Sequence, residues 1–228
     1  MSKGDNDVKV SIHWTYKHPK GRQVELATDF LAANEALFLA EDFEKTGRVK
    51  EIIFYDTSDQ SWTKKELQQY VKGIETEPHD IVVFFDGGYD LESRKAGLGV
   101  SIYFTQNNKK YRIRKNSLFD ELNSNNEAEY AAFWLSLQEL ENLGVHHIEV
   151  TFKGDSQVVL NQLSGDWPVY EEEFSRWIDR IEEKMKKIGI KPIYEPISRK
   201  LNKECDQLAL QALNGIEIDS RIDLQNGE

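Results

Sequence analysis

The sequence predicts an α/β fold, a mixed sheet flanked by helices, preceded by a small α+β N-terminal domain. Residues 81–85 form a continuous apolar run, Ile-Val-Val-Phe-Phe, which is typical of a strand buried on both faces. From there to residue 213, strand patterns alternate with amphipathic helical patterns, as expected when helices cover a sheet. The expected division of the chain is a module at 1–75, a linker at 76–79, an α/β domain at 80–213 and a polar C-terminal tail at 214–228.

The module at 1–75 is expected to fold as β-β-α-β-α. Its first strand gives the clearest signal, because residues 8–17 alternate strictly between apolar and polar side chains. Thr63 and Glu66 have the three-residue spacing of a capping box, which predicts the start of the second helix. The expected strands are 8–17, 24–27 and 49–55, and the expected helices are 33–43 and the segment after Thr63.

The α/β domain is expected to open with strands and to continue with alternating helices and strands. Ser124 and Glu127 have the spacing of a second capping box and predict a helix that ends before Gly144. The expected strands are 81–85, 97–104, 110–115, 147–152 and 190–197, and the expected helices are 124–143, 156–164, 170–188 and 202–213.

Composition restricts the expected cellular location and the kind of binding surface that the protein can have. The net charge is −11, from 29 Lys and Arg against 40 Asp and Glu, which argues against a broad basic face for polyanions. Any contact with nucleic acid must therefore be local. Cys205 is the single cysteine, so no disulfide framework is possible, and no apolar run approaches the ~20 residues that span a bilayer. We expect a cytoplasmic protein with no membrane contact, acting as a monomer.

Four carboxylates stand where an acid is unusual. Asp86 follows the apolar run directly, and a carboxylate at a core edge must be hydrogen-bonded, bound to metal or protonated. Asp155 follows a predicted strand, and Asp206 lies within a predicted helix, where Asp is disfavoured. Glu129 lies two residues after Glu127, so the two cannot share a helix face. Since Glu127 is assigned to the capping box, Glu129 is the candidate for a site.

These acids also have ordinary structural interpretations. Asp86 could begin a turn before glycine, and Asp155 could cap the helix that follows it. Taken together, however, four carboxylates at strand ends and in helices of one α/β domain fit the ligand set of hard divalent cations, which take oxygen ligands and bind alongside substrate phosphates. Metal-dependent chemistry on a phosphate is therefore the working hypothesis.

The acids lie within four segments that carry a family resemblance: FFDGGYD, SNNEAEYAA, KGDSQVVLNQLSGDW and SRKLNKECDQLA. In this order and spacing they resemble the type 1 ribonucleases H, over residues 81–213. The resemblance implies a five-stranded sheet of strand order 3-2-1-4-5, with Asp86, Glu129, Asp155 and Asp206 as catalytic residues that bind two Mg²⁺ or Mn²⁺ ions. The implied reaction is hydrolysis of the RNA strand of an RNA/DNA hybrid by a two-metal-ion mechanism, leaving 5′-phosphate and 3′-hydroxyl ends.

The same resemblance implies contacts with the substrate. The glycine pair would allow the RNA backbone to approach closely, and the polar residues at the helix start would contact the hybrid. Trp167 would pack on the DNA strand, although a core tryptophan near a loop is the alternative. Many members have a histidine shortly before the last acid, and this chain has none there, which leaves the proton donor open. The implied contacts are Gly87, Gly88, Ser124, Asn125, Asn126, Trp167, Arg199 and Asn202.

Two questions stay open at the level of sequence. The module could bind nucleic acid through basic residues of its hairpin, or it could bind a protein partner; Trp14 and Tyr16 fall on the apolar face and are expected in its core. The whole chain could also be a non-catalytic nucleic-acid-binding protein on the same fold, an alternative that the presence of all four acids disfavours. The basic residues of the hairpin are Lys9, Lys17, Lys20 and Arg22.

Overall fold

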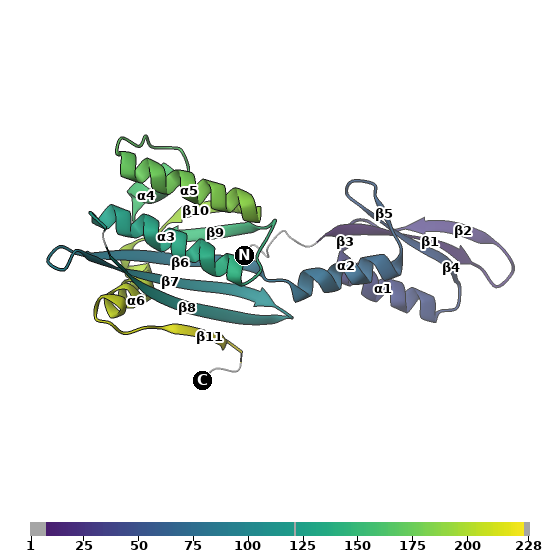
Figure 1. The fold of residues 1–228 in the computed structure, drawn as a ribbon. Helices are drawn as coiled ribbons and strands as arrows, with labels where there is room; N and C mark the ends of the chain where they lie inside the picture. Colours follow the sequence, from purple (N-terminus) through teal and green to yellow (C-terminus); the bar gives the residue numbers. More distant parts are fainter. Residues whose placement is uncertain (1–7, 121, 226–228) are drawn as a thin grey trace. The chain divides into compact units, whose positions relative to one another are not determined.

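The computed structural model describes residues 8–120 and 122–225, without the side chains of residues 74 and 75. The first seven residues of the expected module and the last three of the expected tail lie outside the described residues. The chain divides into two compact units, one ending at Thr76 and the other beginning at Glu77, and each is described by itself (Figure 1). None of the described helices is long and apolar enough to cross a membrane.

The first unit is an antiparallel sheet with two helices packed on one face. Its sheet has the order β2-β1-β4-β5, and β3 also pairs with β1. The predicted β-β-α-β-α order is present, with two additional two-residue strands. The Thr63 capping box forms as expected, because the Glu66 carboxylate accepts a hydrogen bond from the Thr63 backbone N–H at 2.8 Å. The elements are β1 (Lys9–Lys17), β2 (Gln23–Ala27), β3 (Leu31–Ala32), α1 (Ala33–Lys45), β4 (Val49–Asp56), β5 (Ser61–Trp62) and α2 (Lys64–Thr76).

The second unit is a mixed α/β structure, as predicted. Its sheet has the order β10-β9-β6-β7-β8-β11, in which β9 is parallel to both β6 and β10 and the other pairs are antiparallel. A 3₁₀ turn at Arg199–Leu201 precedes the last helix. The elements are β6 (His79–Asp90), β7 (Lys95–Gln106), β8 (Lys109–Asp120), α3 (Asn125–Asn142), β9 (Glu149–Gly154), α4 (Gln157–Leu163), α5 (Glu172–Ile188), β10 (Lys191–Pro196), α6 (Lys203–Leu213) and β11 (Asp219–Asp223).

Three expectations about element boundaries are corrected. The strand that begins at His79 leaves only residues 77–78 between the units, in place of the expected linker at 76–79. It also continues to Asp90, so the expected strand end at residue 85 is wrong. The last helix begins at Lys203, which places Asp206 in its first turn and not in its interior. A carboxylate in the first turn is favoured by the helix dipole, so the propensity argument against Asp at that position does not apply.

The expected polar tail after residue 213 is also corrected, because residues 219–223 form a sixth strand paired with β8. Asn116, 3% exposed, fixes the approach to this strand: its Oδ1 accepts from the Ile218 N–H at 2.7 Å and its Nδ2 donates to the Ile216 carbonyl at 2.9 Å. Lys109 and Lys115 of β8 pair with acids of β11. An edge strand that pairs mainly through polar groups lacks apolar alternation, so its sequence does not reveal it.

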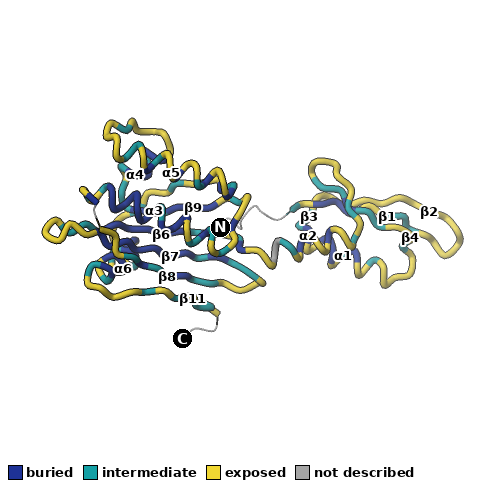
Figure 2. The backbone as a smooth tube through the Cα atoms, viewed as in Figure 1, coloured by how far each residue is buried: buried dark blue, intermediate teal, exposed yellow. Residues whose placement is uncertain are grey.

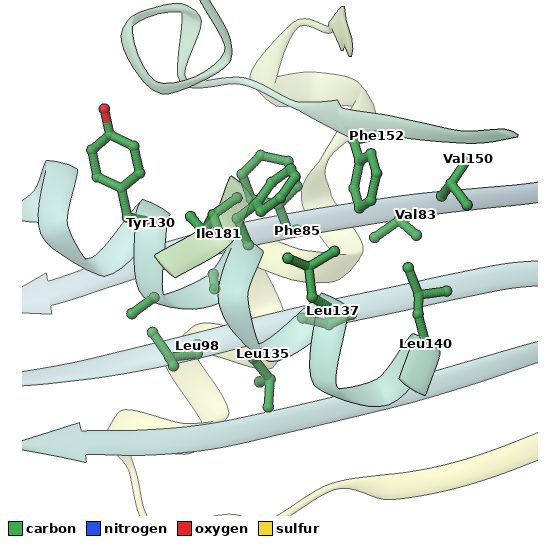
Figure 3. Packing of buried hydrophobic residues seen from close by; sticks show 14 of the residues in the cluster. Val83, Phe85, Leu98, Tyr130, Leu135, Leu137, Leu140, Val150, Phe152 and Ile181 are labelled. Carbon is green, nitrogen blue, oxygen red and sulfur yellow. The ribbon is translucent and has the colours of Figure 1, made fainter. Parts of the chain in front are cut away.

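Helices cover both faces of the six-stranded sheet. Alternate residues of β6 and β7 point to the α3 and α5 side, where they form the main core shown in Figure 3. The central strands are accordingly the most buried part of the unit (Figure 2). On the opposite face α6 lies directly against β7. A Cβ on Gly97 would stand 2.0 Å from the Ala209 carbonyl oxygen, and a Cβ on Gly99 would stand 2.2 Å from the Cys205 carbonyl oxygen, so only glycine allows this approach. These glycines therefore set the position of α6.

Candidate active site

Three of the predicted acids meet in the second unit. Asp86 lies within β6, Glu129 in the first turns of α3, and Asp155 directly after β9. One carboxylate oxygen of each lies within 4.8 Å of the others. Asp86 is only 8% exposed and Glu129 only 5%. Because β6 continues past Asp86, this residue does not begin a turn, and because Ser156 is the cap of α4, Asp155 is not a helix cap. The ordinary interpretations of both acids are therefore wrong.

The acids open into a cavity of about 550 Å³ lined by the end of β6, the start of α3 and residues of α6. Eight of the twelve predicted site residues line it, and four do not: Ser124, Asn126, Trp167 and Asn202. Five further residues complete the wall, among them Tyr89, which lies in the FFDGGYD segment but was not predicted as a site residue, and Leu210, which lies outside the four segments. The lining residues are Asp86, Gly87, Gly88, Tyr89, Asn125, Glu129, Asp155, Ser156, Arg199, Asp206, Ala209, Leu210 and Leu213.

The crowding of negative charge changes how these acids ionise. Burial, and then the charges of Asp155 and Asp206, raise the pKa of Asp86 to about 7. Burial, and then Asp86 and Asp155, raise the pKa of Glu129 well above its ordinary value, against the opposing effect of a hydrogen bond from the Gly87 backbone N–H. The ionised forms therefore need a compensating positive charge in this position.

The donor set fits a hard divalent cation. Glu129 Oε2 is buried and has no hydrogen-bond partner among the described residues, although an unsatisfied buried carboxylate oxygen is costly. It lies in a group of carboxylates that supplies only oxygen donors, which is the chemistry that Mg²⁺ and Mn²⁺ prefer. A bound cation would satisfy the orphaned oxygen and also offset the burial and the repulsion that raise the pKa values of Asp86 and Glu129.

Asp206 stands apart from the three clustered acids. It lines the cavity from α6, where its Oδ1 accepts a hydrogen bond from Arg199 Nη2 at 2.7 Å. Its side chain is 43% exposed and that of Arg199 is 79% exposed. The structure therefore places Asp206 at the open side of the cavity, already paired with a guanidinium.

Asn202 does not fit the predicted contact with substrate. It is only 1% exposed, and its Nδ2 donates to the Phe85 carbonyl oxygen at 2.9 Å and to Asp155 Oδ1 at 3.0 Å. A side chain so deeply buried offers no surface to a polynucleotide. It instead ties the strand residue before Asp86 to the carboxylate of Asp155.

The two glycines differ in what their missing side chains allow. A Cβ on Gly87 would stand 2.2 Å from the Ala128 carbonyl carbon, so this glycine is needed for α3 to pack on β6. That contact alone requires glycine at this position; Gly87 also lines the cavity, so its predicted contact with substrate stays a prediction. At Gly88 the nearest atom, Leu213 Cδ1, is 3.7 Å away, and the residue lines the cavity, so its predicted substrate contact stays a prediction.

The start of α3 separates its two glutamates. Ser124 Oγ accepts from the Glu127 N–H at 3.2 Å, as a capping box requires. The Glu127 carboxylate, however, accepts from the N–H of Asn123 at 2.8 Å, not from that of the cap residue, and also from Trp177 Nε1 at 3.2 Å. Glu127 thus serves the helix start and the core, while Glu129 faces the cavity.

The remaining predicted contacts are divided by the fold. Asn125, the first residue of α3, lines the cavity, whereas Asn126 does not. Trp167 follows α4 and lies outside the cavity; at 45% exposed it is not a core tryptophan either. The structure thus supports Asn125 as a residue of this site, and a contact of Trp167 with DNA stays a prediction.

Comparisons with known proteins identify a family and a shared fold. The sequence profile described as reverse transcriptase-like matches residues 84–212. The chain is 42% identical over 201 residues to a Bacillus subtilis protein named YpeP and described as uncharacterised, covering 88% of each. Ribonuclease H1 of Halobacterium salinarum has a similar structure, with a TM-score of 0.51 and 23% identity over 59% of this chain and 98% of that one.

Two further solved structures are similar in the same way. An N-terminal ribonuclease H domain from Mycobacterium tuberculosis has a TM-score of 0.52 and 24% identity, covering 60% of this chain and 94% of that one. A ribonuclease H1 isolated from compost was solved in complex with an RNA/DNA hybrid; its TM-score is 0.51, at 23% identity over 60% of this chain and 98% of that one. These likenesses establish a shared fold.

Proposed function

The chain belongs to the reverse transcriptase-like, ribonuclease H-like family, and on this premise we propose that it is a metal-dependent endonuclease that cleaves the RNA strand of RNA/DNA hybrids. The observation that carries the proposal is the buried group of Asp86, Glu129 and Asp155 at the base of an open cavity. That the similar compost enzyme was solved with an RNA/DNA hybrid supports the choice of substrate.

Asp86, Glu129, Asp155 and Asp206 would hold two Mg²⁺ or Mn²⁺ ions. When bound, such a pair supplies an activated water and stabilises the leaving 3′ oxygen, which leaves 5′-phosphate and 3′-hydroxyl ends. The protein prepares the ligands: Asn202 holds Asp155 in place, and the Gly87 N–H holds Glu129. Both hydrogen bonds keep carboxylate oxygens oriented toward the cavity before a ligand arrives.

Other residues of the cavity are suited to hold the substrate. Arg199 carries an exposed guanidinium beside the acids and can pair with a phosphate in two parallel hydrogen bonds. Asn125 presents an amide at the N-terminus of α3, where backbone N–H groups and the helix dipole also favour a phosphate. An amide can donate to and accept from a 2′-hydroxyl, the group that distinguishes RNA from DNA.

The non-catalytic alternative is weaker on physical grounds. Carboxylates whose pKa values rise through burial and mutual repulsion lower stability, and a simple binding surface gains nothing from that arrangement. The test is cleavage of an end-labelled RNA/DNA hybrid by the full chain, with Mg²⁺, with Mn²⁺ and with EDTA. Metal-dependent cuts confined to the RNA strand are expected. Tight binding of the hybrid without cleavage in either metal would instead establish the alternative.

For the module we propose a supporting role in binding the hybrid. The structure brings a second basic segment to the hairpin tip, because the Lys17 N–H donates to the Arg48 carbonyl at 2.7 Å. Lys17, Arg22 and Arg48 are all exposed there. Lys9 lies at the opposite end of β1, so it does not belong to this basic end. Trp14 packs on Phe43 at 4.7 Å between ring centroids and lies partly buried against the core of the unit.

The cytoplasmic location expected from the single cysteine stays a prediction. Cys205 is fully buried, and burial raises the pKa of its thiol well above the ordinary value. A buried neutral thiol is unreactive, so it gives this residue no part in the proposed chemistry.

A further inference from the structure

The first turn of α6 is held from the side opposite the cavity by a carboxylate that the proposed reaction does not use. Glu204 Oε2 accepts hydrogen bonds from Ser101 Oγ at 3.0 Å and from the Tyr103 hydroxyl at 2.9 Å. Its other oxygen, Oε1, lies 2.9 Å from Arg112 Nη1. The three partners stand on the neighbouring strands β7 and β8, so Glu204 joins the start of the helix to the sheet.

The same turn carries two residues of the candidate active site. Asn202 directly precedes α6 and holds Asp155, and Asp206 faces the cavity one turn later. Residues four apart share a helix face, whereas residues two apart do not. Glu204 lies midway between them and therefore points away from the cavity, toward the sheet.

Two other contacts also fix α6. Asn116 Nδ2 donates to the Leu208 carbonyl at 3.0 Å, beyond the first turn, and Gly99 allows the sheet to touch the backbone at Cys205 within that turn. Glu204 adds a side-chain anchor to this backbone contact. The Glu204 side chain is 33% exposed and that of Arg112 24%, and a partly buried, charge-assisted set of hydrogen bonds is more directional than a surface ion pair.

We propose that Glu204 is a positioning residue: anchored by Ser101, Tyr103 and Arg112, it sets the first turn of α6 so that Asp206 faces the cavity and Asn202 holds the carboxylate of Asp155 for metal binding. This inference rests on the proposed function, since it assigns to the turn a part in metal binding. Glu204 touches neither metal nor substrate and acts only through these two residues.

The test is a double-mutant cycle on Mn²⁺ affinity, measured by calorimetry on the full chain. Glu204→Ala should weaken Mn²⁺ binding about tenfold, the lower range for residues that orient metal ligands. In an Asp206→Asn background the same change should cost clearly less than tenfold, because only the route through Asn202 and Asp155 remains. Equal losses in both backgrounds, or no loss in the wild-type background, would overturn the proposal.

Further variants keep the result decisive. Tyr103→Phe removes one hydrogen bond without touching α6, and should give a smaller loss of the same kind if Glu204→Ala fails to fold. Glu141→Gln is the matched control: Glu141 pairs with Lys184 and Lys187 between α3 and α5, and its loss should lower the Tm without changing Mn²⁺ affinity. Because Mn²⁺ binding is measured without substrate, failure of hybrid cleavage would reject the proposed function and leave this inference to its own measurement.

Discussion

The acidic cavity of the second unit and the basic end of the first present charge in opposite ways. Asp86 and Glu129 are buried against each other, and their pKa values rise. Lys17, Arg22 and Arg48 stand exposed in solvent at a hairpin tip. A buried charge is coupled strongly to whatever neutralises it, whereas an exposed charge acts weakly, over distance and under salt screening. Single substitutions should therefore change activity and stability strongly in the cavity, and should change substrate binding only weakly at the basic end.

The largest effect is expected for Asp86→Asn. It removes a carboxylate from the centre of the buried group at constant volume, and should lower hybrid cleavage by about 10²–10⁴-fold, since metal ligation is worth several kcal/mol of transition-state stabilisation. Because it also removes a buried repelling charge, the Tm of the metal-free protein should rise by a few degrees near neutral pH.

The matched control is Asp179→Asn, an exposed aspartate on α5. It should leave both the rate and the Tm within error. Cleavage by Asp86→Asn at the wild-type rate, in conditions where EDTA stops the wild type, would remove Asp86 from the mechanism.

A comparison of Glu129→Gln with Glu127→Gln sets a carboxylate of the cavity against a structural carboxylate within one helix. Glu129→Gln should collapse activity with an unchanged or raised Tm, because the carboxylate faces the cavity and glutamine can still accept the hydrogen bond from the Gly87 N–H. Glu127→Gln should keep activity but lower the Tm by a few degrees, since it weakens the hydrogen bonds from Asn123 and Trp177 by about 1 kcal/mol. Activity lost from Glu127→Gln and kept in Glu129→Gln would reverse the assignment.

The buried charge also predicts how stability depends on pH. With a pKa of about 7, Asp86 keeps a proton in the folded metal-free protein that the unfolded chain releases near its ordinary value of 3.8. The free energy of unfolding should therefore fall as pH rises from about 4 to about 7, and level off above that range. Glu129, whose pKa is also raised, contributes in the same direction.

Thermal denaturation in EDTA at a series of pH values measures this dependence. The Tm should decline through the window, and Asp86→Asn should flatten the decline. Saturating Mn²⁺ should reverse the trend, because metal binding displaces the proton and strengthens as pH rises. A Tm that is independent of pH in EDTA would contradict the raised pKa.

The smallest effect is expected at the basic end of the module. Neutralising Lys17, Lys20, Arg22 and Arg48 with Gln should raise the KM for hybrid while kcat stays constant, the pattern of lost uniform binding. The dependence of binding on salt should flatten by at most about 0.9 log unit per lost phosphate contact. Lys9→Gln, at the other end of β1, is the control and should change neither quantity. An unchanged salt slope would favour a protein partner for the module.

The sequence by itself determined the features that depend on neighbouring residues. The apolar run at 81–85, the Thr63 capping box and the helix start at Ser124 are local patterns, and the structure contains all three. The four acids were found because each lies in a short motif. Their order along the chain was enough to expect them at one site.

Tertiary structure alone decided how those acids are held. Asn202 bonds to residues 117 and 47 positions away, and Glu204 to residues 103 and 101 positions away, so no local pattern could reveal either role. The packing of Gly87 against α3 likewise depends on a segment distant in sequence. The edge strand β11 could not be predicted from sequence for a related reason. It pairs through backbone and polar groups, and its residues do not alternate between apolar and polar side chains. Residue types and spacing predict which groups can meet. Only packing between distant segments decides which side of the first turn of α6 is anchored to the sheet and which side faces the cavity.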